Sequence, residues 1–311
     1  MPQISVILPM FDEEDLVDRV VAAVEAELAP LGRSFEIVCV NDGSGDQTGP
    51  RLDALAARDP RVVPVHFSRN FGKEAALSAG LATAGGDAIL VMDADLQHPP
   101  DLIPRMLARW DEGFDVVDAV KSDRGQEGLA YKLASQAFYA LMGRSVGRHL
   151  RGSSDYKLLD RQVVDAVNAC PERNRFFRGL VAWVGFRVAR EPFVVQPRAA
   201  GKTHWSPSGL AAYALRNLLA FSAAPLRAVA WAGLLVLALD LTLAAQTLWN
   251  WWRGVAVSGF TTVILTEGIL GGALLLAIGT IALYVAQIYE EQKARPIYIV
   301  RRERTSPATP R

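Results

Sequence analysis

The stretch Ala88-Ile89-Leu90-Val91-Met92-Asp93-Ala94-Asp95-Leu96-Gln97-His98-Pro99-Pro100 decides the fold of this chain. Its apolar first half predicts a buried strand, and the two prolines end any regular structure. Asp93, Asp95 and Gln97 then stand at the carboxyl end of the strand, where open α/β sheets bind ligands. Their oxygens suit Mg²⁺ or Mn²⁺ held together with substrate phosphates, which implies a nucleotide-diphosphate substrate. The alternative is an Asp-rich turn, and the motif alone favours neither interpretation.

Strand and helix patterns alternate from the N-terminus up to this stretch. Such alternation implies a parallel sheet with crossover helices, and hence an α/β fold. The predicted strands are Gln3–Pro9, Phe35–Val40, Val62–Phe67 and Ala88–Met92, and the predicted helices are Asp12–Leu28, Gly49–Ala57 and Glu74–Ala84.

A polar cluster follows each predicted strand, and the four clusters should meet at one edge of the sheet. Asp42 in the second cluster suits base and ribose recognition, or else serves only the turn. Arg69 and Lys73 in the third suit an anion, or else lie in a solvated loop. The clusters are Pro9–Glu14, Asn41–Thr48, Ser68–Lys73 and Asp93–Pro100.

Two long apolar segments, roughly 228–251 and 260–288, follow a change of composition near residue 225. Each is long enough to cross a membrane, which takes about 20 residues. The alternative, a pair of buried helices in a soluble core, is disfavoured by their length and near absence of charge. Asp240 within the first segment is a functional candidate, but we prefer a polar contact between helices of an oligomer.

Charge predicts the orientation of this helical pair. Basic residues precede the first segment and follow the second, whereas only Arg253 lies in the connection. The positive-inside rule therefore places both termini in the cytoplasm. The formal net charge of the chain is zero, so we expect no nucleic acid partner.

Further motifs extend along nearly the whole chain. They are Leu8–Glu14, Asn41–Ser44, Arg69–Glu74, Met92–Pro100, Asp155–Arg161, Phe177–Leu180, Arg198–Lys202 and Arg295–Tyr298. In combination they resemble the family 2 glycosyltransferases, in the branch that transfers a sugar to a polyprenyl phosphate. The two-helix tail is similar to that of the bacterial undecaprenyl-phosphate glucosyltransferases. Two departures are Asp12, where the family often has Asn, and His204, where it usually has Lys.

The resemblance implies a GT-A fold, which is Rossmann-like with a mostly parallel sheet. The cytosolic catalytic domain would span residues 1–208, followed by an interfacial amphipathic helix at 209–224. Two transmembrane helices would then occupy 225–290, and a cytosolic basic tail 291–311. The resemblance also implies a place in the cytoplasmic membrane and a homotetramer.

The resemblance assigns a donor side to the site. Asp93, Asp95 and Gln97 would surround Mg²⁺ or Mn²⁺ and the donor diphosphate. Arg198 would lie on the loop that closes over the diphosphate. Asp155 is either an orienting carboxylate or half of a structural ion pair with a nearby Arg. The residues expected to bind the nucleotide are Pro9, Asp12, Glu14, Asp42 and Lys73.

The acceptor side would bind the lipid phosphate through Arg124, Lys132 and Ser135. A helix at Leu129–Met142 has one apolar and one polar face, which suits a bilayer surface or, equally, packing on a protein core. A phosphate monoester has a second pKa of about 6 and is already a nucleophile, so no strong base is needed. We therefore expect one in-line displacement with inversion.

UDP-glucose is the donor we expect first. GDP-mannose, a UDP-N-acetylhexosamine or a UDP-aminoarabinose derivative remain alternatives. A processive polysaccharide synthase would carry a Gln-x-x-Arg-Trp motif and more membrane helices than this chain has. An inactive membrane scaffold is a third hypothesis, against which the intact Asp93, Asp95 and Gln97 argue.

Overall fold

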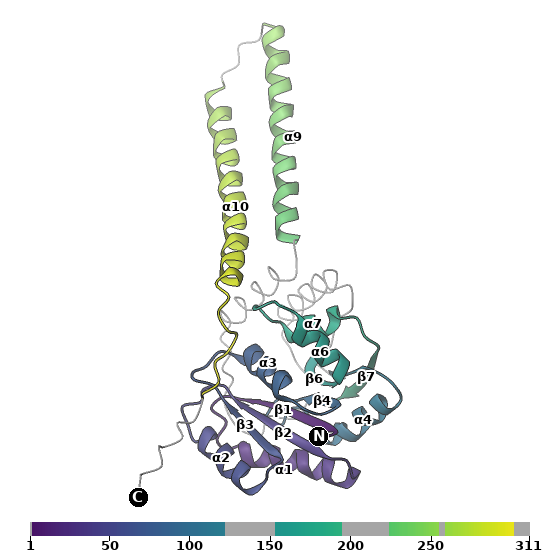
Figure 1. Ribbon diagram of the computed structural model, residues 1–311. Coiled ribbons are helices and arrows are strands. Elements are labelled where there is room, and N and C mark those ends of the chain that lie inside the picture. The colour runs from purple at the N-terminus through teal and green to yellow at the C-terminus, as the bar shows by residue number, and fades with distance from the viewer. Residues whose placement is uncertain (1, 122–152, 195–223, 255–258, 302–311) are drawn as a thin grey trace, which may run out of the picture. The chain divides into compact units, whose positions relative to one another are not determined.

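The computed structural model describes residues 2–121, 153–194, 224–254 and 259–301 of the 311-residue chain. The chain divides into two compact units (Figure 1). The first comprises Met1–Leu210 together with Pro296–Arg311, and the second comprises Ala211–Arg295.

A seven-stranded sheet in the order β3-β2-β1-β4-β6-β5-β7 forms the centre of the first unit. Strand β6 is antiparallel to both of its neighbours, and the other adjacent strands are parallel. The predicted α/β class with a mostly parallel sheet is thus confirmed. The strands are β1 (Ile4–Met10), β2 (Phe35–Asn41), β3 (Val62–His66), β4 (Ala88–Val91), β5 (Val116–Lys121), β6 (Ser153–Asp160) and β7 (Val188–Phe193).

Helices cover both faces of this sheet, because alternate residues of each strand point to opposite sides. Ile4 and Val6 in β1 lie in one core cluster with buried residues of α1 and α4. Ile7 faces α3, where Gly80 allows close approach: a Cβ there would lie 2.3 Å from Cγ2 of Ile7. The helices are α1 (Val17–Leu28), α2 (Thr48–Arg58), α3 (Lys73–Thr83), α4 (Ile103–Asp111), α6 (Arg161–Ala169) and α7 (Phe177–Trp183), with short 3₁₀ turns at Ala29–Leu31 and Pro100–Leu102.

The chain order of the strands reverses between β1 and β4, the inner pair of the β3-β2-β1-β4 half of the sheet. Ligands of open α/β sheets bind outside the carboxyl ends of the strands at such a switch point. The loops that follow β1 and β4 carry the first and the fourth predicted polar clusters. The topology therefore predicts a ligand site at the carboxyl ends of β1 and β4.

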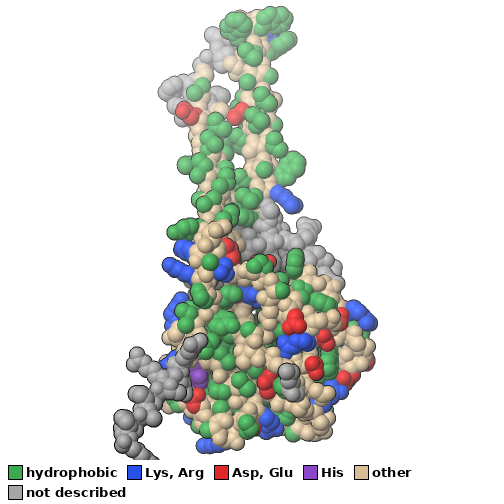
Figure 2. Space-filling view, viewed as in Figure 1, with side chains coloured by type: hydrophobic (Ala, Val, Ile, Leu, Met, Phe, Trp, Pro, Cys, Tyr) green, Lys and Arg blue, Asp and Glu red, His purple; other side chains and the backbone are tan. Residues whose placement is uncertain are grey.

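Two long helices make up the described part of the second unit, α9 (Ala224–Trp252) and α10 (Phe260–Gln292), and they pack against each other. The spans Pro225–Trp252 and Thr266–Gln292 are candidate membrane helices by length and composition. Figure 2 shows hydrophobic side chains along both helices on the face in view. None of either apolar window is buried, unlike the core helices of a soluble protein.

The chain returns to the first unit after α10. Val300 forms an antiparallel bridge with Phe67, which directly follows the edge strand β3. The N–H of Ser68 donates to the carbonyl of Ile299, and that of Arg301 donates to the carbonyl of His66. We call residues 296–301 the C-terminal strap.

Candidate active site

The first two polar clusters are joined by hydrogen bonds. Asp12 adopts a φ of +52°, a conformation that Asn and Asp tolerate better than most residues. Its Oδ1 accepts the N–H of Gly45 at 2.8 Å, and its own N–H donates to Oγ of Ser44 at 3.0 Å. The carboxylate of Glu14 accepts the N–H of Gln47 at 2.9 Å. Asp12 and Glu14 thus fix the turn of the second cluster, and the Asn usual in the family has the same side-chain oxygen to offer.

Asp42 joins the second cluster to the third. Its buried carboxylate accepts the N–H groups of Phe71 at 2.7 Å and Gly72 at 2.9 Å. Burial raises the pKa of Asp42, and the two donors counter part of that rise. Gly43 has a φ of +69°, and a Cβ there would lie 2.3 Å from the carbonyl carbon of Arg69. The two loops are therefore packed backbone to backbone.

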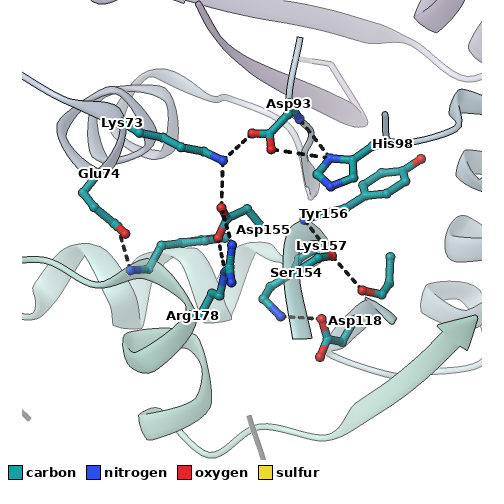
Figure 3. Close-up of polar contacts among 12 residues, drawn as sticks. Lys73, Glu74, Asp93, His98, Asp118, Ser154, Asp155, Tyr156, Lys157 and Arg178 are labelled. Atoms are coloured by element: carbon teal, nitrogen blue, oxygen red, sulfur yellow. Dashed lines mark hydrogen bonds and ion pairs between the residues drawn. The ribbon is translucent and has the colours of Figure 1, made fainter. Parts of the chain in front are cut away.

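Lys73 joins the third cluster to the fourth (Figure 3). Its Nζ lies 2.5 Å from Oδ1 of Asp93 and 2.8 Å from Oδ2 of Asp155. Burial alone lowers the pKa of Lys73, but the two carboxylates outweigh burial and raise it. Burial by itself would raise the pKa of Asp93, but the nearby Lys73 outweighs burial, and the pKa of Asp93 lies below its usual value. The predicted meeting of all four clusters at one edge of the sheet is thereby confirmed.

Asp155 enters the site from β6 and is 6% exposed. Oδ1 of Asp155 accepts from Nε of Arg178 at 2.6 Å, and Oδ2 accepts from Nη2 at 2.9 Å. Arg178 is the second residue of α7, which starts at Phe177. Although burial raises the pKa of Asp155, Arg178 and Lys73 hold it well below the usual range. The ion pair with a nearby Arg, one of the two alternatives for this residue, is therefore observed, and the same carboxylate also pairs with Lys73.

His98 and Tyr156 support the loop that carries Asp93. Nδ1 of His98 accepts the N–H of Asp93 at 3.2 Å, and its ring stacks on Tyr156 with centroids 5.0 Å apart. The hydroxyl of Tyr156 donates to the carbonyl of Pro99 at 3.0 Å. Burial lowers the pKa of His98, so the ring is neutral near pH 7 and carries its proton on Nε2.

Asp95 and Gln97 form a tight turn next to Asp93. Oδ1 of Asp95 accepts the N–H of Gln97 at 3.0 Å, and Leu96 between them has a φ of +58°. Among the described residues, no three His, Cys, Asp or Glu side chains are grouped to hold a metal ion. The two carboxylates on this loop, those of Asp93 and Asp95, are the ligand type that Mg²⁺ takes one or two of, together with substrate phosphates.

Arg178, His98 and Tyr156 were not predicted as site residues. All three lie inside the quoted motifs, but only the rule that a buried carboxylate needs a partner could have selected Arg178. Other predicted residues lie outside the described part of the chain, namely Arg124, Lys132, Ser135, Arg198 and His204 together with the helix at Leu129–Met142. Pro9 lies in β1 beside Val40 of β2, at the carboxyl end of both strands.

Comparison with known proteins supplies a family. The model of glycosyl transferase family 2 matches residues 5–171. An uncharacterized glycosyltransferase of Synechocystis sp. is 38% identical over 300 residues, which cover 96% of this chain and 94% of that protein. The bactoprenol glucosyl transferase of Shigella phage SfV is 37% identical over 306 residues, covering 97% and 99%.

Solved structures are more distant. Glucosyl-3-phosphoglycerate synthase from Mycobacterium tuberculosis, in complex with Mn²⁺, UDP and glucosyl-3-phosphoglycerate, is 20% identical and gives a TM-score of 0.49. The match covers 70% of this chain and 78% of that one.

Proposed function

This chain belongs to glycosyltransferase family 2, and from that premise we propose that it transfers a sugar from a nucleotide diphosphate sugar to a polyprenyl phosphate. UDP-glucose is the donor and undecaprenyl phosphate the acceptor that we favour. Relatives that match over nearly their whole length, and that carry the name bactoprenol glucosyl transferase, support this choice.

One observation carries the proposal: Lys73 lies between Asp93 and Asp155 at the switch point of the sheet. A scaffold has little need for a cation held between two carboxylates where ligands bind. Such a set can bind a diphosphate through the ammonium and a divalent cation through the carboxylates. The arrangement therefore favours an enzyme over an inactive fold.

The reaction that we propose is a single displacement. An oxygen of the lipid phosphate attacks the anomeric carbon as the bond from that carbon to the diphosphate oxygen breaks. The nucleoside diphosphate leaves with the electron pair, and no proton transfer is needed because the acceptor is already an anion. The configuration at the anomeric carbon inverts.

We assign a role in this step to the predicted site residues that the structure describes. Asp93 and Asp95, with Gln97 beside them, would hold Mg²⁺ or Mn²⁺, which neutralises charge on the leaving diphosphate. Lys73 would contact the same diphosphate, while Asp155 and Arg178 fix the position of its ammonium. Asp12, Glu14 and Pro9 would line the nucleotide pocket.

The acceptor side and the membrane arrangement are part of the same proposal. Arg124, Lys132 and Ser135 would bind the lipid phosphate, and Arg198 would close over the donor. The helices α9 and α10 would cross the cytoplasmic membrane, with the catalytic unit and both termini in the cytoplasm. A homotetramer is the assembly that we expect.

A direct assay tests the proposal. Membranes that contain the protein would be incubated with undecaprenyl phosphate and each of UDP-glucose, GDP-mannose, a UDP-N-acetylhexosamine and a UDP-aminoarabinose derivative, and the lipid product identified by mass. We expect a glycosyl-phosphate lipid with one donor, and its loss on chelation or in Asp95→Ala. Turnover that persists in Asp95→Ala with the metal chelated would exclude the metal assignment. Absence of lipid product with every donor would exclude the function.

A further inference from the structure

We infer that the C-terminal strap positions the third polar cluster, Ser68–Lys73, which we call the donor-binding loop. Tyr298 is the residue through which the strap acts on this loop. The inference rests on the proposed function only for the identity of the ligand. The strap follows α10 after Lys293, Ala294 and Arg295. It belongs to the first unit although the helix that precedes it belongs to the second.

The strap is fixed to the sheet edge by its backbone. Ser68 and Arg301 donate the N–H groups that flank the bridge between Phe67 and Val300, at 3.0 Å and 2.7 Å. The side chains of Ile299 and Val300 remain 52% and 45% exposed. The strap therefore adds a short edge pairing rather than a core strand, and apolar burial of these two residues does not explain it.

An aromatic series leads inward from the strap. The ring of Tyr298 stacks on Phe67, with centroids 5.0 Å apart and planes 10° apart. Phe67 is 3% exposed and meets the ring of Phe71 edge to face, with centroids at 5.7 Å. The guanidinium of Arg69 covers the Phe71 ring, with its central carbon 4.1 Å from the centroid. Tyr298 is thus the outer member of the stack that holds Phe71.

The series ends at the candidate active site. The N–H of Phe71 is one of the two donors to Asp42, and Lys73, two residues further on, contacts Asp93 and Asp155. Movement of the Phe71 ring would move both the Asp42 anchor and the N-terminus of α3. Tyr298 is therefore a positioning residue for donor binding, with no contact to the reacting atoms required.

This arrangement predicts a separation of kinetic effects. Loss of the Tyr298 ring should loosen the loop and raise the KM for the nucleotide sugar, with kcat changed much less. A stacked aromatic pair contributes enough for an increase of up to about tenfold. Tyr298→Phe keeps the stacking ring and should keep the wild-type KM. Ile299→Ala alters an exposed neighbour in the same strap and serves as the matched control.

Hydrogen exchange measured by mass spectrometry on the full-length protein in detergent tests the inference without the donor. We expect amides of the peptide that contains residues 67–73 to exchange faster in Tyr298→Ala, and at the wild-type rate in Tyr298→Phe and Ile299→Ala. Unchanged exchange there in Tyr298→Ala overturns the inference, whatever the activity. Faster exchange with an unchanged KM, in a wild-type enzyme that makes lipid product, also overturns the positioning role. Failure of the wild type to make product with any donor counts instead against the proposed function.

Discussion

The Nζ atom of Lys73 lies 2.5 Å from Oδ1 of Asp93, so that the first residue of α3 forms an ion pair with the loop after β4. Asp93 is also a proposed ligand of the divalent metal ion. In the proposed site an ammonium group and a metal ion would therefore share one carboxylate. Binding of the ion would weaken the pair with Asp93 and leave Lys73 with Asp155. A diphosphate oxygen of the donor is the natural second partner for its ammonium group.

We expect Lys73→Met to bind Mn²⁺ more tightly than the wild type when no donor is present, while transfer activity falls. Removal of the ammonium group takes away its repulsion of Mn²⁺. This repulsion is about 1 kcal/mol, a low value because Lys73 is partly exposed, and it corresponds to roughly a fivefold change in the affinity for Mn²⁺. Titration of free Mn²⁺ by electron paramagnetic resonance measures this. Lys73→Arg keeps the charge and is the control. Weaker Mn²⁺ binding in Lys73→Met would show that Lys73 aligns the carboxylates rather than competing for them.

Local patterns allow the first half of the sheet to be predicted well. The strand predicted at Gln3–Pro9 is observed at Ile4–Met10, and the one predicted at Ala88–Met92 ends one residue earlier, at Val91. Apolar runs of this kind are bounded by turn residues that show where each strand ends. The edge at which the polar clusters meet follows from their order alone, because parallel strands end on the same side.

Long-range partners were beyond prediction from the sequence. The bond from Asp155 to Lys73 joins residues that lie 82 positions apart, and it requires β6 to insert antiparallel beside β4. No local pattern specifies that insertion. The same is true of Phe67 and Tyr298, whose stacking brings a segment beyond the two apolar helices back to β3. The sequence placed Lys73, Asp155 and Tyr298 in motifs and Phe67 at the end of a predicted strand, but only the fold shows what these residues contact.

Asp155→Asn should be strongly destabilising. The substitution leaves Arg178 and Lys73 facing a neutral amide in a buried site, and breaking a buried pair in this way costs about 3 kcal/mol. Thermal unfolding in detergent measures the effect. Asp165→Asn is a matched control, because Asp165 is exposed and its carboxylate lies 3.8 Å from Arg161, and we expect a change within about 0.5 kcal/mol. Equal stability of the two variants would contradict a structural role for the Asp155 network.

His98 should make the catalytic unit less stable in mild acid. Because burial lowers the pKa of His98 in the folded chain, the unfolded chain binds this proton more tightly. Its contribution to stability is full above the ordinary pKa of about 6.5 and is lost as the pH falls below it, at about 1 kcal/mol per pH unit. The charged groups that act on His98 are the same in the wild type and in a variant that changes His98 alone. They are Asp93, Asp95, Asp155 and Lys73.

His98→Gln offers an oxygen to the N–H of Asp93 and does not titrate. We therefore expect its unfolding temperature to change less than that of the wild type between pH about 8 and about 5.5. Parallel curves for the two proteins over this range would show that His98 does not carry the effect.

Orientation in the membrane can be tested with one introduced thiol at a time. Cys39 and Cys170 are both buried, so a membrane-impermeant thiol reagent should react slowly with the native chain. Arg253→Cys places a thiol in the connection between α9 and α10, and Arg58→Cys places one at the exposed end of α2. If both termini are cytoplasmic, intact cells should label only the first of these, and permeabilised cells should label both. Labelling of Arg58→Cys in intact cells would place the catalytic unit outside the cytoplasm and contradict the expected orientation. Because nucleotide sugars are absent there, this result would also count against the proposed reaction.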